Sequence, residues 1–242
     1  MPVLSIVIPA YNEGAFIGKL LEEIIAVPTE SLGFVKEILV VNDGSTDNTE
    51  QIARGFSGVR CFTQIPNRGK GKAVQRGIRE ATGDYILIQD ADLEYDPRDY
   101  LPILAALREK NADVVYGSRT LGQMRGRSGW SLFPGRHPRQ GVGPWLAGAL
   151  LTLWTALIWG RWITDTLTGY KLYPAGIVKD MKLRTSGFET DHEITAKLIR
   201  RGQKIVEVPI AYNPRSAEEG KKIKASDGLI AVWTLLKFRF TD

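Results

Sequence analysis

Tyr85-Ile-Leu-Ile-Gln-Asp-Ala-Asp-Leu-Glu94 is the segment that indicates the fold most clearly. Its first half is a short apolar run after a Thr-Gly-Asp turn, which is typical of a buried parallel strand. Three carboxylates follow within five residues, Asp90, Asp92 and Glu94. Ligands of an open α/β sheet bind at the carboxyl ends of its strands, and alternating oxygen ligands suit a divalent cation that also holds a diphosphate. A solvated acidic loop before a helix near Pro97 is the alternative, and the D-x-D spacing alone does not separate the two.

Apolar runs alternate with amphipathic segments along much of the chain. This alternation predicts an α/β fold with a mostly parallel sheet flanked by helices. We expect strands at residues 4–9, 37–41, 59–64, 85–89, 113–116 and 204–208. We expect helices at residues 15–26, 100–110 and 227–240. Three more are expected: one that starts near residue 49, one that follows the 67–72 turn and ends at 81, and one that begins in the 187–193 segment and ends at 201. The polar turns that follow parallel strands would lie together on one edge of the sheet.

The bulk composition is that of an ordinary folded protein. Of the 242 residues, 43% are apolar and 24% are charged, enough for one large core. The single cysteine excludes an internal disulfide and fits a reducing compartment. With two histidines and one cysteine, a zinc site is not expected. The N-terminal segment has no basic region and no small-residue cleavage site, so we expect no secretory signal.

The middle of the chain is basic and lacks acidic residues. The formal net charge is +5, and residues 114–164 contain no aspartate or glutamate. The arginines of this stretch are Arg119, Arg125, Arg127, Arg136, Arg139 and Arg161. Such a stretch predicts an anionic partner, whether phosphate groups, a membrane surface or nucleic acid. Its tryptophans lie mostly in an apolar run rather than among the arginines, which favours lipid over single-stranded nucleic acid.

Residues 140–160 form an uncharged run that contains Trp145, Trp154 and Trp159. The length admits a membrane-spanning helix. Glycines and a proline weaken its first half, however, and a crossing would separate the acidic tip from everything after Arg161. We therefore expect an interfacial helix with its tryptophans at headgroup depth, and a buried core helix is the alternative. The amphipathic 227–240 helix, with basic residues near its end, suits the same surface.

A glycine-rich turn, Asn67-Arg-Gly-Lys-Gly-Lys72, follows the third predicted strand. Its backbone N–H groups and lysines suit a phosphate. The turn matches neither the P-loop nor the dinucleotide-binding pattern, so those two interpretations lose support. Each polar turn taken singly is explained as an ordinary loop, but the turns taken together favour a ligand site at one edge of the sheet.

Three segments resemble the signature segments of inverting family-2 glycosyltransferases, which have the GT-A (Rossmann-like) fold. These segments are Ser5-Ile-Val-Ile-Pro-Ala-Tyr-Asn-Glu13, Val40-Val-Asn-Asp-Gly-Ser-Thr-Asp47 and Gln89-Asp-Ala-Asp-Leu-Glu94. The most similar subgroup is the polyprenyl- or dolichyl-phosphate sugar synthases, which includes dolichol-phosphate mannose synthases and dolichyl-phosphate glucosyltransferases. The resemblance extends over residues 5–233 and is specific in the first 120.

The resemblance implies a nucleotide-sugar donor and Mg²⁺ or Mn²⁺. The donor contacts that it implies are Pro9, Ala10, Tyr11, Glu13, Asp43, Lys72, Asp90, Ala91 and Asp92. Asp90 and Asp92 would be the carboxylates for the diphosphate and the metal. Glu94 stands where the subgroup often has a glutamine beside the metal, so its charge is expected to change the metal preference.

In the second half of the chain the resemblance implies an acceptor site. Residues 165–173, 187–193 and 213–224 are similar to segments that lie near the acceptor in the subgroup. The basic residues expected to hold an acceptor phosphate are Arg119, Arg136, Arg139, Arg215 and Lys221. An acceptor hydroxyl would instead need a general base, for which Asp191 and Glu189 are the candidates. Acidic residues at a helix N-terminus also simply suit the helix dipole.

We therefore expect one GT-A catalytic domain, with a nucleotide-sugar half at residues 1–119 and an acceptor half with membrane-interface helices at 120–242. The expected reaction is metal-dependent, inverting transfer of a sugar from a UDP- or GDP-sugar to a polyprenyl or dolichyl phosphate. The candidate catalytic residues are Asp92, Arg119, Arg215 and Asp191. The expected location is the cytoplasmic face of a membrane, with no nucleic-acid partner. Transfer to a hydroxyl of a glycolipid or polysaccharide is the alternative.

Overall fold

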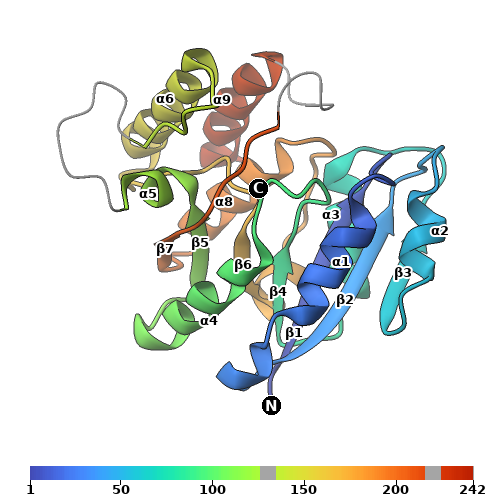
Figure 1. Ribbon diagram of the computed structural model, residues 1–242. Helices are drawn as coiled ribbons and strands as arrows, with labels where there is room; N and C mark the ends of the chain where they lie inside the picture. The colour runs from blue at the N-terminus through green and yellow to red at the C-terminus, as the bar shows by residue number, and fades with distance from the viewer. Residues whose placement is uncertain (126–134, 216–224, 242) are drawn as a thin grey trace.

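The computed structural model describes residues 1–125, 135–215 and 225–241. In these residues, seven strands form one sheet in the order β3-β2-β1-β4-β6-β5-β7 (Figure 1). Neighbouring strands pair in parallel except β6, which is antiparallel to β4 and β5. The strands are β1 Val3–Ala10, β2 Val35–Asn42, β3 Val59–Thr63, β4 Tyr85–Ile88, β5 Val114–Ser118, β6 Lys171–Pro174 and β7 Ile205–Pro209. The predicted α/β fold with a mostly parallel sheet is confirmed.

Helices cover both faces of this sheet (Figure 1). The α-helices are α1 Ile17–Ala26, α2 Thr49–Arg54, α3 Lys70–Glu80, α4 Tyr100–Glu109, α5 Arg119–Met124, α6 Val142–Trp159, α7 Ala175–Lys179, α8 Thr190–Arg200 and α9 Ala225–Phe240. Two 3-10 helices are η1 Thr29–Leu32 and η2 Pro97–Asp99. One core layer contains side chains of α1 and α4, and the other contains side chains of α3, α7 and α8.

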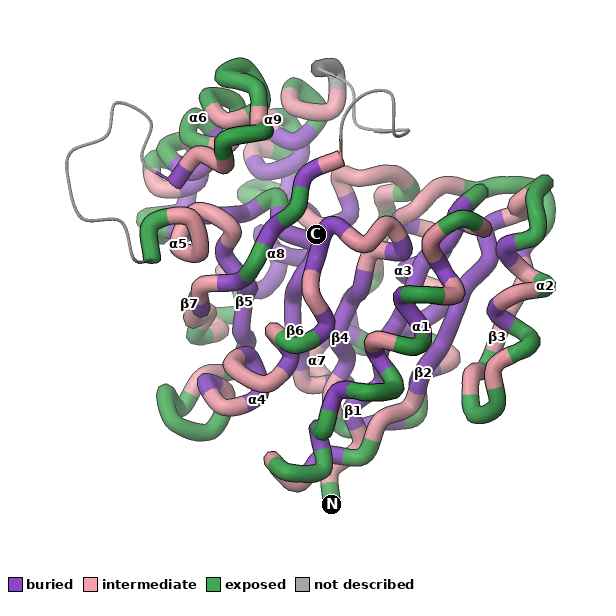
Figure 2. Tube along the Cα trace, in the orientation of Figure 1, coloured by how far each residue is buried: buried purple, intermediate pink, exposed green. Residues whose placement is uncertain are grey.

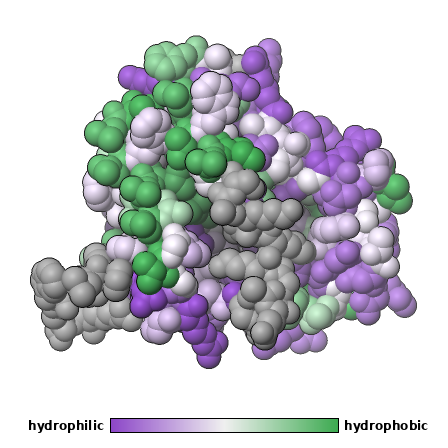
Figure 3. Space-filling view, turned by 90° about the horizontal axis from the view of Figure 1, so that it is seen from above, coloured by the Kyte–Doolittle hydropathy of each residue, from purple (hydrophilic) through white to green (hydrophobic). Residues whose placement is uncertain are grey.

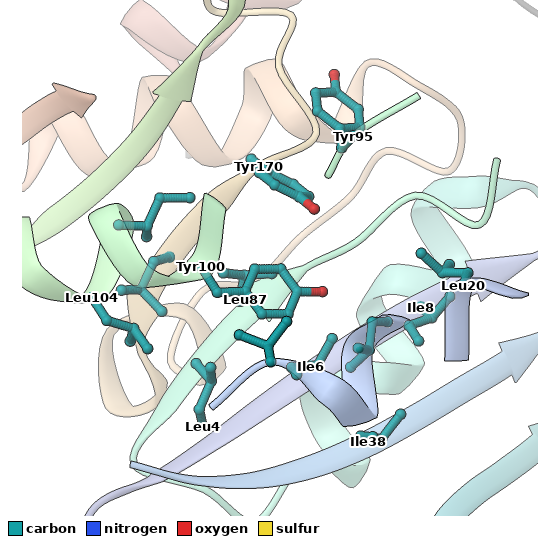
Figure 4. Close-up of a cluster of buried hydrophobic side chains, with 14 of the residues drawn as sticks. Leu4, Ile6, Ile8, Leu20, Ile38, Leu87, Tyr95, Tyr100, Leu104 and Tyr170 are labelled. Atoms are coloured by element: carbon teal, nitrogen blue, oxygen red, sulfur yellow. The ribbon is translucent and has the colours of Figure 1, made fainter. Parts of the chain in front are cut away.

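The side chains of β1 show how the two layers arise. Leu4, Ile6 and Ile8 belong to the layer of α1 and α4, whereas Val7 belongs to the layer of α3 and α8. Successive side chains of a strand point to opposite faces of the sheet, so an uninterrupted apolar run fills both layers. Figure 4 shows Ile8 near Leu20 of α1 within this core. Burying each such side chain contributes about 1.5–3 kcal/mol.

A third, smaller core joins α6 and α9 to α8. Its buried members are Leu151, Trp159, Ala196, Ala231, Leu235 and Phe238. The two helices lie side by side above the sheet in Figure 1. Figure 2 shows that much of the surface of α6 and parts of α9 are exposed. The predicted 140–160 and 227–240 helices are thus present as a pair with one buried side.

The sequence pattern does not predict β6, α5 or α7. Strand β6 is only four residues long, and its sequence Lys-Leu-Tyr-Pro begins with a lysine that interrupts the apolar pattern. Lys171 is nevertheless fully buried, because its ammonium group reaches the backbone oxygen of Thr166 at 3.2 Å and lies 3.4 Å from a carboxylate oxygen of Asp191. Since β6 pairs with both β4 and β5, one sheet extends across residues 1–119 and 120–242.

Candidate active site

The end of β4 is held in place by aromatic side chains beneath it. Tyr100 and Tyr170 both donate to Oε1 of Gln89, each at 2.6 Å. All three residues are fully buried, and Figure 4 shows the two rings one above the other beside the strand. Tyr95 stacks on Tyr170 with ring centroids 4.7 Å apart. The residue before Asp90 is therefore fixed, and the aspartates that follow leave the sheet in a defined direction.

Each aspartate of the D-x-D lies against a different cation. Asp90 Oδ1 is 2.6 Å from Nζ of Lys70, and Asp92 Oδ2 is 3.0 Å from a terminal nitrogen of Arg215. The guanidinium of Arg215 also lies 3.4 Å from Glu13 and 3.8 Å from Glu94. These side chains come from the first turn of α3, the segment after β7 and the segment after β1. The fold therefore gathers an acidic edge and two cations at the carboxyl end of β4.

The crowding of carboxylates changes the protonation of Asp92. Burial, with added repulsion from Asp90 and Glu94, raises the pKa of Asp92 to about 7, and Arg215 opposes this increase. Burial alone would lower the pKa of Lys70, but Asp90 and Asp191 together raise it above its ordinary value. The ammonium group of Lys70 therefore stays charged. The carboxylates around Asp92 electrostatically favour the binding of a further cation.

Asp43, which follows β2, anchors the glycine-rich turn. One of its carboxylate oxygens accepts from the N–H of Arg68 at 2.8 Å and from Nε2 of Gln64 at 2.5 Å. The other accepts from the N–H of Gly69 at 2.8 Å. Gly69 has a φ of +92°, and a Cβ there would lie 2.6 Å from the carbonyl oxygen of Ser186. Only glycine fits this position, and the turn brings Lys70 to the acidic edge.

The predicted donor contacts at the end of β1 lie beside the turn after β2, since the N–H of Asp43 donates to the carbonyl oxygen of Ala10 at 2.8 Å. Pro9 and Ala10 are buried at the end of the strand, and the side chain of Tyr11 is 38% exposed. The backbone N–H of Glu13 donates to Oγ1 of Thr49 at 2.9 Å, and its carboxylate faces Arg215. Ala91, between the two aspartates, is buried. The fold thus brings the ends of β1, β2 and β4 together, as the sequence predicts.

Two of the predicted donor and metal residues have other contacts in the structure. Nζ of Lys72 donates to Oε1 of Gln75, one turn further along α3, at 3.0 Å. Glu94 accepts from the backbone N–H of Arg215 at 2.9 Å. Glu94 therefore fixes the segment that carries Arg215. Their roles toward nucleotide and metal stay predictions.

Arg119, predicted to hold an acceptor phosphate, is paired with Asp165. Its Nε and one terminal nitrogen donate to the two carboxylate oxygens at 2.7 and 2.8 Å, and its backbone N–H also donates to Asp165 at 3.0 Å. The guanidinium lies 5.0 Å from the ring centroid of Tyr212. Residues 114–164 contain no acid, but the next residue, Asp165, provides one. Any phosphate at Arg119 would therefore meet a cation whose charge is already partly neutralised.

The other predicted phosphate contacts come from different segments of the chain. A terminal nitrogen of Arg136 donates to the backbone oxygen of Gln140 at 2.6 Å, and Arg139 is exposed. Both arginines shortly precede α6. Lys221 lies outside the described residues. The structure thus places Arg136 and Arg139 beside the start of the apolar helix, and Arg215 among the carboxylates.

The two candidate bases are both engaged. Glu189 accepts from the N–H groups of Ser186 at 3.2 Å and Gly187 at 3.1 Å. Asp191 lies 3.4 Å from Lys171 and 3.8 Å from Lys70. Burial opposes the effect, but the two lysines lower the pKa of Asp191 below its ordinary value. A carboxylate with a lowered pKa is a weaker base.

The acidic edge fits a divalent cation that is shared with a substrate. Among the described residues, no three His, Cys, Asp or Glu side chains are arranged to hold a metal by themselves. Magnesium sites often use one or two carboxylates together with substrate phosphates, so such a cluster is not required. The described ion pairs around the D-x-D join five carboxylates to three cations. The surplus is two negative charges when all of these groups are ionised. These groups are Glu13, Asp90, Asp92, Glu94 and Asp191 with Lys70, Lys171 and Arg215.

Three charged residues, two of this edge and one beside Arg119, are absent from the sequence-based site. Lys70 stands two positions before Lys72 in the same turn, and the turn alone does not show which lysine faces inward. Lys171 and Asp165 lie in the 165–173 segment that resembles the acceptor region, but no spacing rule links them to their partners. The one signal in the sequence is a lysine inside an expected buried segment, because a buried charge needs a counter-charge somewhere in the fold.

Comparison with known proteins agrees with this geometry. Residues 5–149, more than half of the chain, match the family described as glycosyl transferase family 2. The chain is 30% identical over 245 residues to the dolichyl-phosphate beta-glucosyltransferase ALG5A of Trichomonas vaginalis, covering 96% of this chain and 71% of that protein. It is 30% identical over 222 residues to the dolichol-phosphate mannosyltransferase of Pyrococcus furiosus, covering 90% and 58%.

The chain is shorter than several of these relatives. It spans about half, 49%, of the low-salt glycan biosynthesis hexosyltransferase Agl6 of Haloferax volcanii, with 29% identity over 219 residues and 90% of this chain covered. Its fold matches a crystal structure of glucosyl-3-phosphoglycerate synthase from Mycobacterium tuberculosis in complex with Mn²⁺, UDP and phosphoglyceric acid. The TM-score is 0.72 at 21% identity, covering 100% of this chain and 80% of that one.

The seven-stranded sheet with a D-x-D at the end of β4, in the described part of the chain, has the GT-A fold. The chain belongs to glycosyl transferase family 2. The resemblance read from the three sequence segments is therefore confirmed.

Proposed function

We propose that this glycosyltransferase moves a sugar from a UDP- or GDP-sugar, with Mg²⁺ or Mn²⁺, to a polyprenyl or dolichyl monophosphate. The proposed place of reaction is the cytoplasmic face of a membrane. Relatives named dolichyl-phosphate glucosyltransferase and dolichol-phosphate mannosyltransferase, each 30% identical, support this acceptor class.

The observation that carries the proposal is an exposed apolar face on α6 and α9. Leu150 and Leu157 of α6 are 56% and 70% exposed, and Trp233 of α9 is 62% exposed. Figure 3 looks down on the molecule from above the view of Figure 1 and shows hydrophobic residues gathered on one side. Among the described helices, α6 alone is long and apolar enough to cross a membrane. Large exposed apolar faces mark surfaces that bind lipid or protein.

Two of the three tryptophans of α6 pack against α9. Trp159 is only 7% exposed, and Nε1 of Trp154 donates to the backbone oxygen of Val232 at 3.1 Å. The reason is that these two rings form the contact between α6 and α9. Leucines of α6 and Trp233 of α9 are exposed instead. This face is suited to a polyprenyl chain or a bilayer surface.

The charges near the acceptor favour a phosphate nucleophile. A phosphate monoester has a second pKa near 6, so at neutral pH it is mostly a dianion and needs no protein base. Asp191 is held by two lysines that lower its pKa, and Glu189 caps a turn. A hydroxyl acceptor would need one of these carboxylates as its base, and both already have partners in the structure.

The proposed step is a displacement at C1 of the donor sugar. An acceptor phosphate oxygen bonds to C1 from one face while the bond from C1 to the diphosphate oxygen breaks on the other, so the anomeric configuration inverts. Asp92 would hold the cation, which neutralises the charge that develops on the leaving diphosphate. Arginine side chains would orient the acceptor phosphate, and the candidates are Arg119, Arg136, Arg139 and Arg215.

A direct test is a screen of UDP- and GDP-sugars with a short polyprenyl phosphate and Mg²⁺ or Mn²⁺, with products identified by mass. The matched control acceptor is the polyprenol of the same length without its phosphate. We expect a glycosylated lipid phosphate with one nucleotide series and no product from the alcohol. Product from the polyprenol, or none from the phosphate with any donor, contradicts the proposed acceptor.

A further inference from the structure

Four charged side chains form a continuous line from the D-x-D into the second half of the chain. Nζ of Lys70 lies 2.6 Å from Asp90 and 3.8 Å from Asp191, and Asp191 lies 3.4 Å from Nζ of Lys171. Lys70 and Asp90 belong to residues 1–119, whereas Asp191 and Lys171 belong to 120–242. Negative and positive groups alternate along this line, so each central group has an opposite charge on both sides.

The inner end of the line is fixed. Lys171 is fully buried in β6, and its ammonium group also approaches the backbone oxygens of Thr166 at 3.2 Å and Asp191 at 3.4 Å. A buried ammonium group without a counter-charge is costly, and Asp191 is its only carboxylate partner among the described residues. Asp191 is therefore held by a buried cation whose position is fixed.

The outer end is also confined. A Cβ at Gly71 would lie 2.0 Å from Oγ1 of Thr190, so the first turn of α3 packs directly on the start of α8. A Cβ at Gly169 would lie 2.5 Å from Oδ2 of Asp90, so the segment before β6 closes one side of this carboxylate. Lys70 itself lies 5.5 Å from the ring centroid of Phe188. These contacts leave the ammonium group of Lys70 between the two aspartates.

We infer that Asp191 is a positioning residue that acts through Lys70, and that it does not accept a proton from the acceptor. Asp191 holds the ammonium group of Lys70 on Asp90. The anionic diphosphate of the donor then meets a neutralised Asp90 instead of a bare carboxylate. This inference deepens the proposed function, since it depends on a nucleoside diphosphate sugar as the donor.

Removing the charge of Asp191 would disturb Lys70 through Lys171. The two ammonium groups repel each other, and Asp191 lies between them. In Asp191→Asn the repulsion is no longer offset, so Lys70 loses its position at Asp90. Lys70→Met removes the same cation directly. Both changes should therefore weaken donor binding by the same route, and the second change should add little once the first is made.

The test is calorimetric binding of UDP and of GDP, each with Mn²⁺, to wild type, Lys70→Met, Asp191→Asn and the double variant. We expect each single variant to bind about tenfold more weakly, and the double variant also about tenfold rather than about a hundredfold. Lys70→Arg keeps the cation and should recover most of the affinity. Lys19→Met and Asp180→Asn, which remove charges from exposed surface pairs, are the matched controls and should bind as wild type does. Thermal melting of each variant confirms folding.

A second readout separates positioning from base catalysis. If Asp191 acts through Lys70, the pH–rate profile of Asp191→Asn keeps the acid limb of wild type, and its defect appears in the KM of the donor. Normal nucleotide binding with turnover lost and the acid limb abolished would overturn the inference in favour of a base. Additive losses in the double variant would overturn it as well. A wild-type protein that binds neither nucleotide overturns the proposed donor, and this inference with it.

Discussion

Residues 1–119 and 120–242 contribute to the site in different ways. In the first part, Glu13, Asp43 and the D-x-D each follow a strand, and parallel pairing brings the ends of β1, β2 and β4 to one edge. In the second part the charged residues lie mostly in loops and at helix starts. Arg215 meets Asp92 across 123 positions in the sequence. A strand-end site is therefore visible as a repeated local pattern, whereas a site made of long-range pairs is not.

One buried group in each part gives a pH dependence of opposite direction. Asp92 has a raised pKa, so its contribution to stability is present at low pH and is lost as the pH rises from about 4 to about 7. His192 on α8 has a lowered pKa, so its contribution is present at neutral pH and is lost on acidification. The directions differ because burial disfavours the charged form, which raises the pKa of the Asp92 carboxyl and lowers the pKa of the His192 imidazole; Asp90 and Glu94 add to the first shift, and Lys171 adds to the second.

The largest expected effect is in the first part, at Asp92. Asp92→Asn should reduce sugar transfer about 10³-fold, because the cation and the leaving diphosphate lose their carboxylate. The metal-free variant should melt at a higher temperature than wild type at pH 8, since repulsion from Asp90 and Glu94 is relieved. Steady-state kinetics and thermal melting with and without Mn²⁺ measure both. A variant that keeps full turnover would remove the D-x-D from the mechanism.

The next effect is in the second part, at His192. Burial and Lys171 lower the pKa of His192 to about 4, whereas the unfolded side chain titrates near 6.5. The folded protein should lose about 3 kcal/mol of stability from this group as the pH falls from 6.5 to 4. Urea unfolding of wild type and His192→Asn at several pH values isolates this contribution, because other titrations cancel in the difference. Parallel curves for the two proteins would show that the buried imidazole does not set the acid sensitivity.

Arg119 tests whether a paired arginine still serves the acceptor. Arg119→Met should lower kcat/KM for a polyprenyl phosphate about 50-fold and leave the Kd for UDP or GDP with Mn²⁺ unchanged. The variant also leaves Asp165 without its partner, so a companion variant, Arg119→Met with Asp165→Asn, controls for the unpaired charge. Full activity in this double variant would mean that the pair is only structural.

The smallest effect concerns the apolar face. Replacing Leu150 and Leu157 of α6 by serine should weaken association with anionic liposomes about tenfold, because less apolar surface enters the bilayer. Ile25→Ser on α1 is the matched control from the first part, since Ile25 is also an exposed aliphatic side chain, at 45%. Vesicle sedimentation measures the partition. Equal losses for both proteins would show that the α6 face has no special affinity for lipid.

The local pattern of apolar and polar residues determined most of the strands and helices. The six predicted strands are present, because apolar runs bounded by polar turns fix strands without reference to distant residues. The three segments that carry the resemblance lie at neighbouring strand ends, so their position at one edge follows from parallel pairing alone. The 140–160 and 227–240 helices also follow from composition, although the sequence does not show which of their apolar sides is buried.

Tertiary structure alone decided the pairing of charges. Strand β6 enters antiparallel between β4 and β5. Lys171 meets Asp191, 20 positions away in sequence, and Asp165 meets Arg119, 46 positions away. The choice of Lys70 over Lys72 depends on the direction in which α3 leaves its turn, and the partner of Arg119 depends on the fold of a segment 46 positions later. An ion pair is set by distance in space and by burial, and neither is encoded in the spacing of residues along the chain.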